Sequence, residues 1–458
     1  MECAAEMTTT LVYGLAIAGR AVATELVARG ENVILCDDIE NQIHDSFAKT
    51  LNSRFMCKPS AEDLQGLIAE SDRVVPAPGV SVSHQLFAVA SKMNKVVMSE
   101  IELAYQFEQQ TKKPRPMVAI TGTDGKTTTT LMATAMLNSA KHKTLAVGNT
   151  ETPLIAALRS DAQAFAVECS SFRLALTQSF RAQASVWLNL APDHLDWHES
   201  LETYRMAKAK IWANLEQSDV AVVPVADKSI SKFAEVSNGR VVSFGTDSGD
   251  YHCANGKLVS PHGEILHVNE MSRSLPHDVT NALAAAAISI ESGLASCAQV
   301  AEALRTFENA PHRIEFVAES NGVRWFNDSK ATSPHAVSVA LKSFSSIVLI
   351  AGGKNKDLDL RKMADFPKNM KAVVAIGVAA KDIAKAFAGI CEVRIANSMA
   401  EAIKHADELA SSGDVVLLSP GCTSYDWYKN YGERGDDFKK EVKAMISLKQ
   451  KLNSQRQN

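Results

Sequence analysis

Residues 117–127 read MVAITGTDGKT, an apolar run followed by a turn with two glycines and then Lys126 and Thr127. The run Met117–Ile120 predicts a buried strand, and the pattern that continues through about Ala140 predicts a helix. Glycines let the N–H groups of such a turn face a phosphate, and the helix N-terminus adds partial positive charge. Lys126 would reach the β- and γ-phosphate oxygens, and the Thr127 hydroxyl would ligate Mg²⁺. The stretch predicts a nucleotide-phosphate loop; because Ile120 replaces the usual first glycine, an ordinary turn is the alternative.

Two further sections begin in the same way. Leu11–Tyr13 leads into the turn Gly14–Gly19 and a helix over Ala21–Ala28, and Ile347–Ala351 leads into Gly352-Gly353-Lys354. Other apolar runs without a polar alternation predict buried strands at Ala164–Cys169, Ala184–Leu190, Val220–Val225, Lys371–Gly377 and Asp414–Ser419. Strand, glycine turn and helix in succession predict an α/β fold with parallel sheets, which bind ligands at the carboxyl ends of their strands.

Length and composition limit the classes of protein. The chain has 458 residues, of which 46% are hydrophobic and 22% charged, so several globular domains are expected and disorder is excluded. A formal net charge of −4 argues against nucleic acid as a partner. We expect no membrane insertion, because no apolar run approaches a membrane span. The eight cysteines form no CxxC pair, so neither a zinc knuckle nor a redox pair is expected, and thiols scattered in this way are expected to be buried and reduced. The opening segment carries Glu2 and Glu6 and no Lys or Arg, so a signal peptide is not expected and a cytoplasmic protein is.

Two polar, proline-bearing stretches are plausible domain boundaries. They are Gln109–Pro116 and Glu308–Pro311. They predict three α/β domains, which we place at residues 1–112, 113–310 and 311–458.

Charged residues near the ends of the central strands are candidates for a metal site. Glu168 ends a strand and could hold Mg²⁺, or it could cap the next turn. His194 could be a second ligand, although a lone histidine is more often structural. Lys208 lies on an expected helix, Leu201–Trp212, and its spacing alone predicts a solvated lysine. Tyr204 and Trp212, one turn to either side, are expected in the core.

The remaining polar clusters could bind anions or ribose. In the first glycine turn Ala16 stands in place of the middle glycine of a dinucleotide fingerprint, so that turn could bind a nucleotide or only preserve the fold. Asp37 and Asp38 follow the next strand, where a ribose partner would lie. In the last third, Asn327–Thr332 and Ser419–Ser424 follow apolar strands and would suit phosphates or a carboxylate substrate.

Taken together, these blocks resemble the Mur ligases, the ATP-dependent amide-forming enzymes of peptidoglycan precursor synthesis. The resemblance covers the chain from end to end. It is carried by the blocks Thr121–Thr127, Asn189–Asp196, Tyr204–Lys208, Asn327–Thr332, Leu418–Asp426 and Arg434–Phe438. The last two blocks are most similar to the members that add D-glutamate to UDP-N-acetylmuramoyl-L-alanine.

The resemblance implies a three-domain α/β fold: a Rossmann-like domain for the UDP-sugar, a P-loop-type central ATPase with a parallel sheet, and a Rossmann-like C-terminal domain for the amino acid. It implies ATP and two Mg²⁺ ions as cofactors, a carbamylated Lys208, and UDP-N-acetylmuramoyl-L-alanine and D-glutamate as substrates of a monomer.

The same resemblance implies roles for individual residues. Catalytic roles fall to Lys126, His194, Lys208 and Lys330. Nucleotide contacts fall to Gly122, Thr123, Asp124, Gly125, Lys126, Thr127, Thr128, Asn281, Arg313 and Asp328, and metal contacts to Thr127, Glu168, His194 and Lys208. Substrate contacts fall to Ile17, Ala18, Asp37, Gly79, Asn149, Thr332, Lys356, Ser424, Tyr425 and Tyr431.

Some positions depart from the family pattern. Asp124 replaces the usual asparagine of the phosphate loop and adds negative charge there. Leu275-Pro276-His277-Asp278 lacks the glycine of G-x-H-N and carries aspartate for asparagine. Asn149-Thr150-Glu151 lacks the glycine that commonly follows.

Three other functions remain open on the sequence. They are a related ligase with another acceptor, such as L-alanine or a folylpolyglutamate, a nicotinamide oxidoreductase using the first glycine turn, and a non-catalytic nucleotide-binding protein. Ala16 and the lysine-bearing second loop count against the oxidoreductase.

Overall fold

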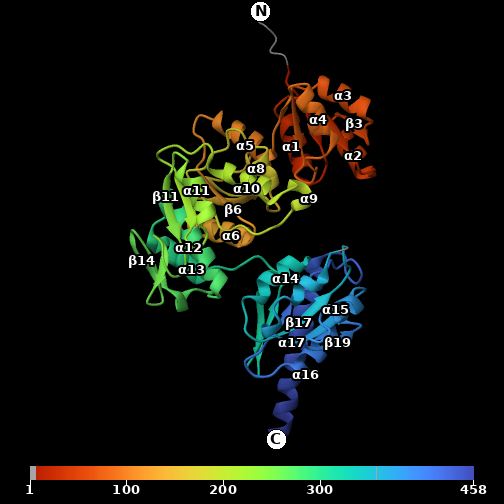
Figure 1. Ribbon diagram of the computed structural model, residues 1–458, viewed down its shortest axis with the longest axis vertical. Helices are drawn as coiled ribbons and strands as arrows, with labels where there is room; N and C mark the ends of the chain where they lie inside the picture. The colour runs from red at the N-terminus through yellow and green to blue at the C-terminus, as the bar shows by residue number, and fades with distance from the viewer. Residues whose placement is uncertain (1–6, 357, 458) are drawn as a thin grey trace, which may run out of the picture. The chain divides into compact units, whose positions relative to one another are not determined.

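A computed structural model describes residues 7–356 and 358–457 and confirms the α/β class (Figure 1). The chain divides into two compact units, one ending at Phe307 and one beginning at Glu308. The division into three domains stays a prediction, because the sheets expected for the first two lie within one unit. In the part of the chain described, no helix has the length and apolar character needed to span a bilayer.

The first unit opens with a five-stranded parallel sheet in the order β3-β2-β1-β4-β5. The strand order reverses at β1, between β2 and β4, which is where ligands bind in such sheets. The strands are β1 Thr9–Tyr13, β2 Asn32–Asp37, β3 Arg54–Cys57, β4 Arg73–Pro76 and β5 Val96–Val97. The helices are α1 Ile17–Ala28, α2 Gln42–Thr50, α3 Ala61–Ala69, α4 Gln85–Lys92 and α5 Glu100–Gln109.

The second sheet has six parallel strands in the order β11-β10-β9-β6-β8-β7. The central strand β6 therefore has β8 on one side and β9 on the other, so the chain segments after these three strands meet at one edge. The strands are β6 Met117–Thr121, β7 Thr144–Gly148, β8 Ala164–Glu168, β9 Ala184–Trp187, β10 Val220–Pro224 and β11 Arg240–Phe244. The sequence-predicted strands here are confirmed: β6 ends one residue later than expected, and β8, β9 and β10 end one to three residues earlier.

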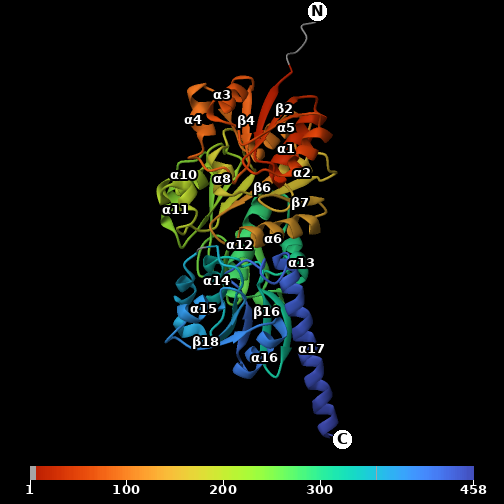
Figure 2. The same cartoon turned by 90° about the vertical axis from the view of Figure 1, so that its right-hand side faces the viewer.

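Helices and a small antiparallel sheet complete the first unit. Helices α6, α12 and α13 pack against one another (Figure 2). The helices are α6 Lys126–Ser139, α7 Leu154–Ala157, α8 Ser171–Ala175, α9 Leu195–His198, α10 Leu201–Ala209, α11 Lys228–Glu235, α12 Pro276–Glu291 and α13 Cys297–Thr306, with 3₁₀ turns η1 Lys210–Trp212 and η2 Val268–Glu270. The antiparallel strands are β12 His252–Ala254, β13 Lys257–Ser260 and β14 Gly263–His267.

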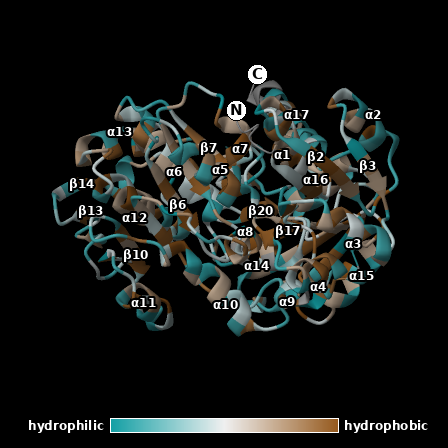
Figure 3. Cartoon of the chain, turned by 90° about the horizontal axis from the view of Figure 1, so that it is seen from above, coloured by the Kyte–Doolittle hydropathy of each residue, from teal (hydrophilic) through white to brown (hydrophobic). Residues whose placement is uncertain are grey.

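Alternation along the strands produces the cores of this unit. Val118 and Ile120 of β6 face α6, α12 and α13 in one core, whereas Met117 and Ala119 face the opposite side. That second core continues without interruption onto α1, α5 and one face of the first sheet. Successive side chains of a strand point to opposite faces, so a strand covered on both faces must be apolar throughout. Strand β6 shows this hydrophobic character in Figure 3.

The second unit is a six-stranded sheet in the order β15-β16-β20-β17-β18-β19, antiparallel only at β15–β16. One face packs on α16 and α17, and α17 extends past the sheet (Figure 1). The strands are β15 Glu315–Ser320, β16 Val323–Asn327, β17 Ile347–Gly352, β18 Met370–Ile376, β19 Glu392–Ala396 and β20 Val415–Leu418. The helices are α14 Pro334–Leu341, α15 Ala380–Ala386, α16 Met399–Leu409 and α17 Tyr431–Gln457, with η3 Leu360–Ala364 and η4 Pro367–Asn369.

The third glycine turn differs from the expected strand–turn–helix unit. After β17 no α-helix follows directly; the next helical segment is the 3₁₀ turn η3. The backbone N–H of Lys354 donates to the carbonyl of Thr423 at 2.9 Å, and that of Thr423 donates to the carbonyl of Lys354 at 3.0 Å. Pairing with the loop after β20 therefore replaces the helix that the glycines suggested.

Candidate active site

The glycine loop lies at the carboxyl end of β6, and α6 begins at Lys126 directly after it. Gly125 is the N-cap of α6 with a φ of +79°, a conformation that side chains other than glycine rarely adopt. A Cβ atom at this position would lie 2.5 Å from Oδ1 of Asn281 in α12. Asn281 thus lies against the loop, and only glycine fits between them.

Asn189, which follows β9, braces the same loop from the other side. Its Oδ1 accepts the backbone N–H groups of Thr123 at 3.0 Å and Asp124 at 2.9 Å. Its Nδ2 donates to the carbonyl of Asp124 at 3.2 Å. No role was assigned to Asn189 from the sequence; its position at the end of a strand was the available signal.

Two lysines converge on one carbonyl of the loop. The Nζ of Lys126 donates to the carbonyls of Gly122 at 2.9 Å and Thr123 at 2.8 Å, and the Nζ of Lys208 donates to the carbonyl of Gly122 at 2.7 Å. Lys208 is only 1% exposed, so the expectation of a solvated lysine is wrong. The physical reason is that α10 turns this face of the helix inward, where Tyr204 is also buried and its hydroxyl lies 3.2 Å from that of Thr123.

Burial changes the acid–base behaviour of Lys208. Removal from water, and then repulsion by the ammonium group of Lys126, hold the pKa of Lys208 well below its usual range. Asp193 and Asp124 oppose this shift more weakly. A lysine buried in this way gives up its proton more readily than an exposed one, and the neutral amine that results is nucleophilic.

Glu168 ends β8, next to the loop, with only one carboxylate oxygen paired. Its Oε1 accepts a hydrogen bond of 2.8 Å from Nδ2 of Asn149, whereas its Oε2 is buried without a hydrogen-bond partner. A buried, unpaired carboxylate oxygen is costly unless it has a ligand. Oxygen donors such as this one and the hydroxyl of Thr127, in the first turn of α6, are the ligands that Mg²⁺ prefers, so these residue types fit a magnesium ion.

His194 precedes α9 and is half-exposed. It adopts a left-handed conformation with a φ of 52°, and its Nε2 lies 3.3 Å from Oδ2 of Asp193. Its ring packs edge-on against Phe172 of α8, with centroids 4.7 Å apart. The described residues contain no group of three or more histidine, cysteine, aspartate and glutamate side chains that could hold a metal by themselves. A second ion at His194 would therefore need a ligand of another kind.

Four of the five residues expected to hold the UDP-sugar lie after β1, at the end of β2 and after β4, at the carboxyl edge of the first sheet. Asp37 accepts the N–H of Leu15 at 2.6 Å through Oδ2 and that of Ile39 at 2.8 Å through Oδ1. Its carboxylate thus braces two loops. Ile17 is 66% exposed, and Gly79 has open space where a Cβ would lie. Of the other two expected residues, Ala18 is buried in α1, and Asn149 follows β7, beside Glu168.

In the second unit, Asp328 joins three parts of the chain. Its Oδ1 accepts the N–H of Ile314 at 3.2 Å, and its Oδ2 accepts the hydroxyl of Ser419 at 2.7 Å. Asp328 follows β16 and Ser419 follows β20, and these two strands are neighbours in the sheet. The expected cluster at these strand ends is thus brought together, with Asp328 buried at its centre.

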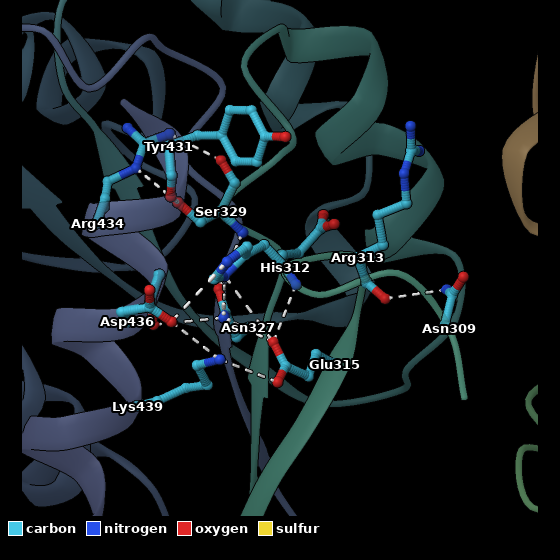
Figure 4. Close-up of polar contacts among 12 residues, drawn as sticks. Asn309, His312, Arg313, Glu315, Asn327, Ser329, Tyr431, Arg434, Asp436 and Lys439 are labelled. Atoms are coloured by element: carbon cyan, nitrogen blue, oxygen red, sulfur yellow. Dashed lines mark hydrogen bonds and ion pairs between the residues drawn. The ribbon is translucent and has the colours of Figure 1, made fainter. Parts of the chain in front are cut away.

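Figure 4 shows the polar contacts around the start of this unit. The side chain of Arg313 extends away from the cluster that contains His312, Glu315 and Asn327. Burial, and then repulsion by Lys439, lower the pKa of His312. The Nζ of Lys330 lies 5.3 Å from the centre of the Tyr431 ring, a cation–π distance.

Arg434 holds the loop that carries Lys330. It is 1% exposed and donates to the hydroxyl of Ser329 through Nε at 2.9 Å, to the carbonyl of Ser329 through Nη2 at 2.9 Å and to that of Cys422 through Nη1 at 3.1 Å. Burial lowers the pKa of Arg434 to about 10. The residues expected around the amino acid differ in access: Ser424 is buried, Thr332 and Tyr431 are half-buried, and Lys356 and Tyr425 are exposed.

Comparison with known proteins identifies relatives over almost the whole chain. The Mur ligase middle domain matches residues 120–289, and the glutamate ligase domain of Mur ligases matches residues 312–422. UDP-N-acetylmuramoylalanine–D-glutamate ligase of Frankia casuarinae is 36% identical, covering 95% of this chain and 93% of the relative. The enzyme of the same name from Pelotomaculum thermopropionicum is 37% identical, covering 96% and 97%.

Solved structures show the same fold at lower identity. UDP-N-acetylmuramate-alanine ligase MurC of Thermotoga maritima matches with a TM-score of 0.58 and 20% identity, covering 96% of this chain and all of its own. MurF of Acinetobacter baumannii matches with a TM-score of 0.56 and 18% identity, covering 95% and 91%.

Proposed function

Because the chain belongs to the Mur ligase family, we propose that it joins D-glutamate to UDP-N-acetylmuramoyl-L-alanine in an ATP-dependent step of peptidoglycan precursor synthesis. Mur ligases use ATP and Mg²⁺. In the proposed reaction the carboxylate of the UDP-sugar substrate attacks the γ-phosphate of ATP, giving an acyl phosphate and ADP. The amine of D-glutamate then attacks the acyl carbon and releases phosphate. The names and coverage of the relatives support this assignment.

The observation that carries the proposal is the grouping of donors at the ends of β6, β8 and β9. The loop Gly122–Gly125, the N-terminus of α6 and Lys126 would bind the triphosphate. The carbonyls of Gly122 and Thr123 now hold Lys126, and phosphate oxygens would replace them as partners. Thr123, Asp124, Thr128 and Asn281 would complete the nucleotide contacts from this unit, and Arg313 and Asp328 those from the second unit.

Thr127 and Oε2 of Glu168 would hold one Mg²⁺ ion, and His194 with a modified Lys208 would hold a second. Bound Mg²⁺ would offset the negative charge of the transferring phosphoryl group. The open oxygen of Glu168 supports the first site.

We propose that Lys208 is carbamylated. Its neutral amine would add to CO₂ and release a proton, giving an anionic carbamate at the end of the side chain. The carbamate would attract the ammonium group of Lys126, which lies at the same carbonyl of Gly122 as Lys208. The carbamate would also supply an oxygen ligand to the second Mg²⁺ ion beside His194.

The other assigned residues would hold the two substrates. Ile17, Ala18, Asp37, Gly79 and Asn149 would surround the UDP-sugar, with Asp37 acting through the loops that it braces. Lys330, Thr332, Lys356, Ser424, Tyr425 and Tyr431 would surround D-glutamate and the transferred phosphoryl group. We further propose that the protein is cytoplasmic and acts as a monomer. Sedimentation of the purified protein tests the monomeric state.

A substrate panel tests the function. ADP release is measured with ATP, Mg²⁺ and UDP-N-acetylmuramoyl-L-alanine against a set of amino acids, and we expect D-glutamate to give the highest rate. A higher rate for L-alanine with UDP-N-acetylmuramate, or for glutamate with a folate, would contradict the proposal in favour of a related ligase. Nucleotide binding without ADP release from any mixture would indicate a non-catalytic protein.

The variant Lys208→Ala tests the proposed modification. We expect it to lose most ligase activity and not to recover with added bicarbonate. The matched control is Lys210→Ala, because Lys210 lies on the same segment but donates to the carbonyls of Ala175 and Thr177. Carbon-13 bicarbonate should give a carbamate signal in the parent protein and in the Lys210 variant only. A nearly normal rate for Lys208→Ala would remove this residue from the mechanism.

A further inference from the structure

We propose that Arg173 is a positioning residue that acts through Asn149 to fix the carboxylate of Glu168, so that Oε2 stays available to the metal. The inference rests on the proposed function, because that function makes Glu168 a magnesium ligand. Arg173 itself would contact neither metal nor substrate.

A continuous line of hydrogen bonds joins these residues. Nη1 of Arg173 donates to Oδ1 of Asn149 at 2.7 Å, and Nδ2 of Asn149 donates to Oε1 of Glu168 at 2.8 Å. The backbone N–H of Asn149 also donates to the carbonyl of Glu168 at 2.8 Å. With the amide oxygen facing a guanidinium and its NH₂ facing a carboxylate, only one orientation of the Asn149 side chain satisfies both neighbours. One oxygen of Glu168 is thereby occupied and the other is left open.

A second buried charge holds Arg173 in place. Its Nε lies 3.4 Å from Oε2 of Glu100 in α5, and the side chains are 7% and 1% exposed. Oε1 of Glu100 accepts the N–H of Ile155 at 2.7 Å. Helix α8, which carries Arg173, packs beside α5 (Figure 1). The guanidinium is therefore fixed by a carboxylate of α5 as well as by the amide oxygen of Asn149.

The position of Arg173 in the chain links two of the proposed metal ligands, Glu168 and His194. Strand β8 ends at Glu168, and α8 begins at Ser171. Phe172 in the same helix packs against the ring of His194. Partners that orient a metal ligand in this way are worth about 10–100-fold in metal affinity.

Charge alone provides a competing explanation, in which Arg173 only neutralises Glu100. A design that removes the pair together separates the two roles, because losing both partners leaves no unpaired buried charge. Glu100→Gln keeps the donor from Arg173 to Asn149. The double variant Glu100→Gln/Arg173→Met removes it. Arg173→Lys keeps a positive charge and an N–H donor.

The matched control is Arg181→Met/Asp219→Asn. This pair is a second ion pair of the same unit, with Nε of the half-buried Arg181 2.6 Å from Oδ2 of the buried Asp219, and neither residue belongs to the line from Arg173 through Asn149 to Glu168. Glu168→Gln serves as the variant that removes the metal ligand itself.

The measurement is binding of Mn²⁺, followed by electron paramagnetic resonance in the presence of a non-hydrolysable ATP analogue, with thermal unfolding as a check on folding. We expect Glu100→Gln/Arg173→Met to weaken Mn²⁺ binding at least about tenfold. Glu100→Gln, Arg173→Lys and the control pair should stay within about threefold of the parent protein, since none loses the donor to Asn149.

The outcomes separate this inference from the proposed function. Parent-like Mn²⁺ binding by Glu100→Gln/Arg173→Met, together with weakened binding by Glu168→Gln, would overturn the role of Arg173 and leave the metal site intact. Parent-like binding by Glu168→Gln would overturn the metal site and with it this inference. Equal weakening by the control pair would show a general loss of stability and would also contradict the proposal.

Discussion

Gly125 stands where the chain turns from β6 into α6, in a left-handed conformation and against Asn281. Gly125→Ala should destabilise the protein by about 1–3 kcal/mol and should also abolish nucleotide binding, because a side chain is strained at this φ and the added methyl group displaces the Asn281 amide from the loop. Gly293→Ala is the matched control, since its φ is +73° but nothing lies within 4 Å of the added methyl group. Denaturant unfolding and titration with ATP measure both effects. Equal nucleotide affinity in the two variants would contradict the role assigned to the loop.

Lys208 predicts a dependence of stability on pH. Its pKa is lowered in the folded protein from an unfolded value of 10.5, so the unfolded state binds more protons between these two values. The free energy of unfolding of the parent relative to Lys208→Met should rise with pH in that window, by up to about 1.4 kcal/mol per pH unit. Urea unfolding in bicarbonate-free buffers below pH 10.5 measures this difference in the free energy of unfolding. Lys232→Met is the control, because Lys232 is exposed. A difference independent of pH would contradict the burial of a neutral amine.

At the scale of elements, α5 is fastened to the segment after α8 by one carboxylate. Glu102 accepts the backbone N–H groups of Gln178 at 3.0 Å, Ser179 at 3.0 Å and Phe180 at 2.9 Å, and the hydroxyl of Ser179 at 2.5 Å. Burial alone would raise the pKa of Glu102, but the hydrogen bonds from Ser179 and Gln178 outweigh it and lower the pKa. The charged form is therefore the one that the fold stabilises.

Glu102→Gln should lower the free energy of unfolding by about 2–3 kcal/mol at neutral pH, because an NH₂ group would face several N–H donors. The lowered pKa means that this contribution is present above pH 4.5 and is lost as the pH falls through the folded value. Urea unfolding across that range should show the difference between parent and variant shrinking in acid. Glu70→Gln, in an exposed pair with Arg54, should change stability by less than about 1 kcal/mol. A similar loss in both variants would contradict the clamp.

At the scale of the whole molecule, each compact unit has a hydrophobic core of its own. We expect two thermal transitions in calorimetry of the full chain. Leu283→Ala in the first unit and Leu417→Ala in the second remove the same atoms from fully buried sites and should each cost about 2–5 kcal/mol. Each substitution should lower only one transition, by several degrees, and an ATP analogue should raise the transition of the first unit, which carries the phosphate loop. A shift of both transitions by either substitution would show that the chain unfolds as a single cooperative unit.

Local patterns predicted most of the fold. The apolar runs at 117–120, 164–169 and 347–351 are buried strands in the structure. A strand that is covered on both faces has apolar residues at successive positions, so its sequence shows no alternation with polar residues. The glycine loop could also be predicted from a local pattern, because its strand, glycines, lysine and helix start are contiguous in the chain. The α-helix expected directly after 347–351 failed, because the backbone there pairs with residues near Thr423 instead.

Properties that depend on distant neighbours came only from the folded chain. Lys208 is buried, with a lowered pKa, where its Nζ donates to the carbonyl of Gly122, 86 residues away in the chain. Arg173 and Glu100 are paired although 73 residues separate them in the chain. Asp37, which is expected to contact the UDP-sugar, accepts hydrogen bonds from backbone N–H groups with both of its carboxylate oxygens. Periodicity reports which face of an element is apolar, but charge state and free hydrogen-bonding capacity depend on which groups the packing places around a side chain. Those groups are chosen by tertiary contacts, which no local stretch of sequence encodes.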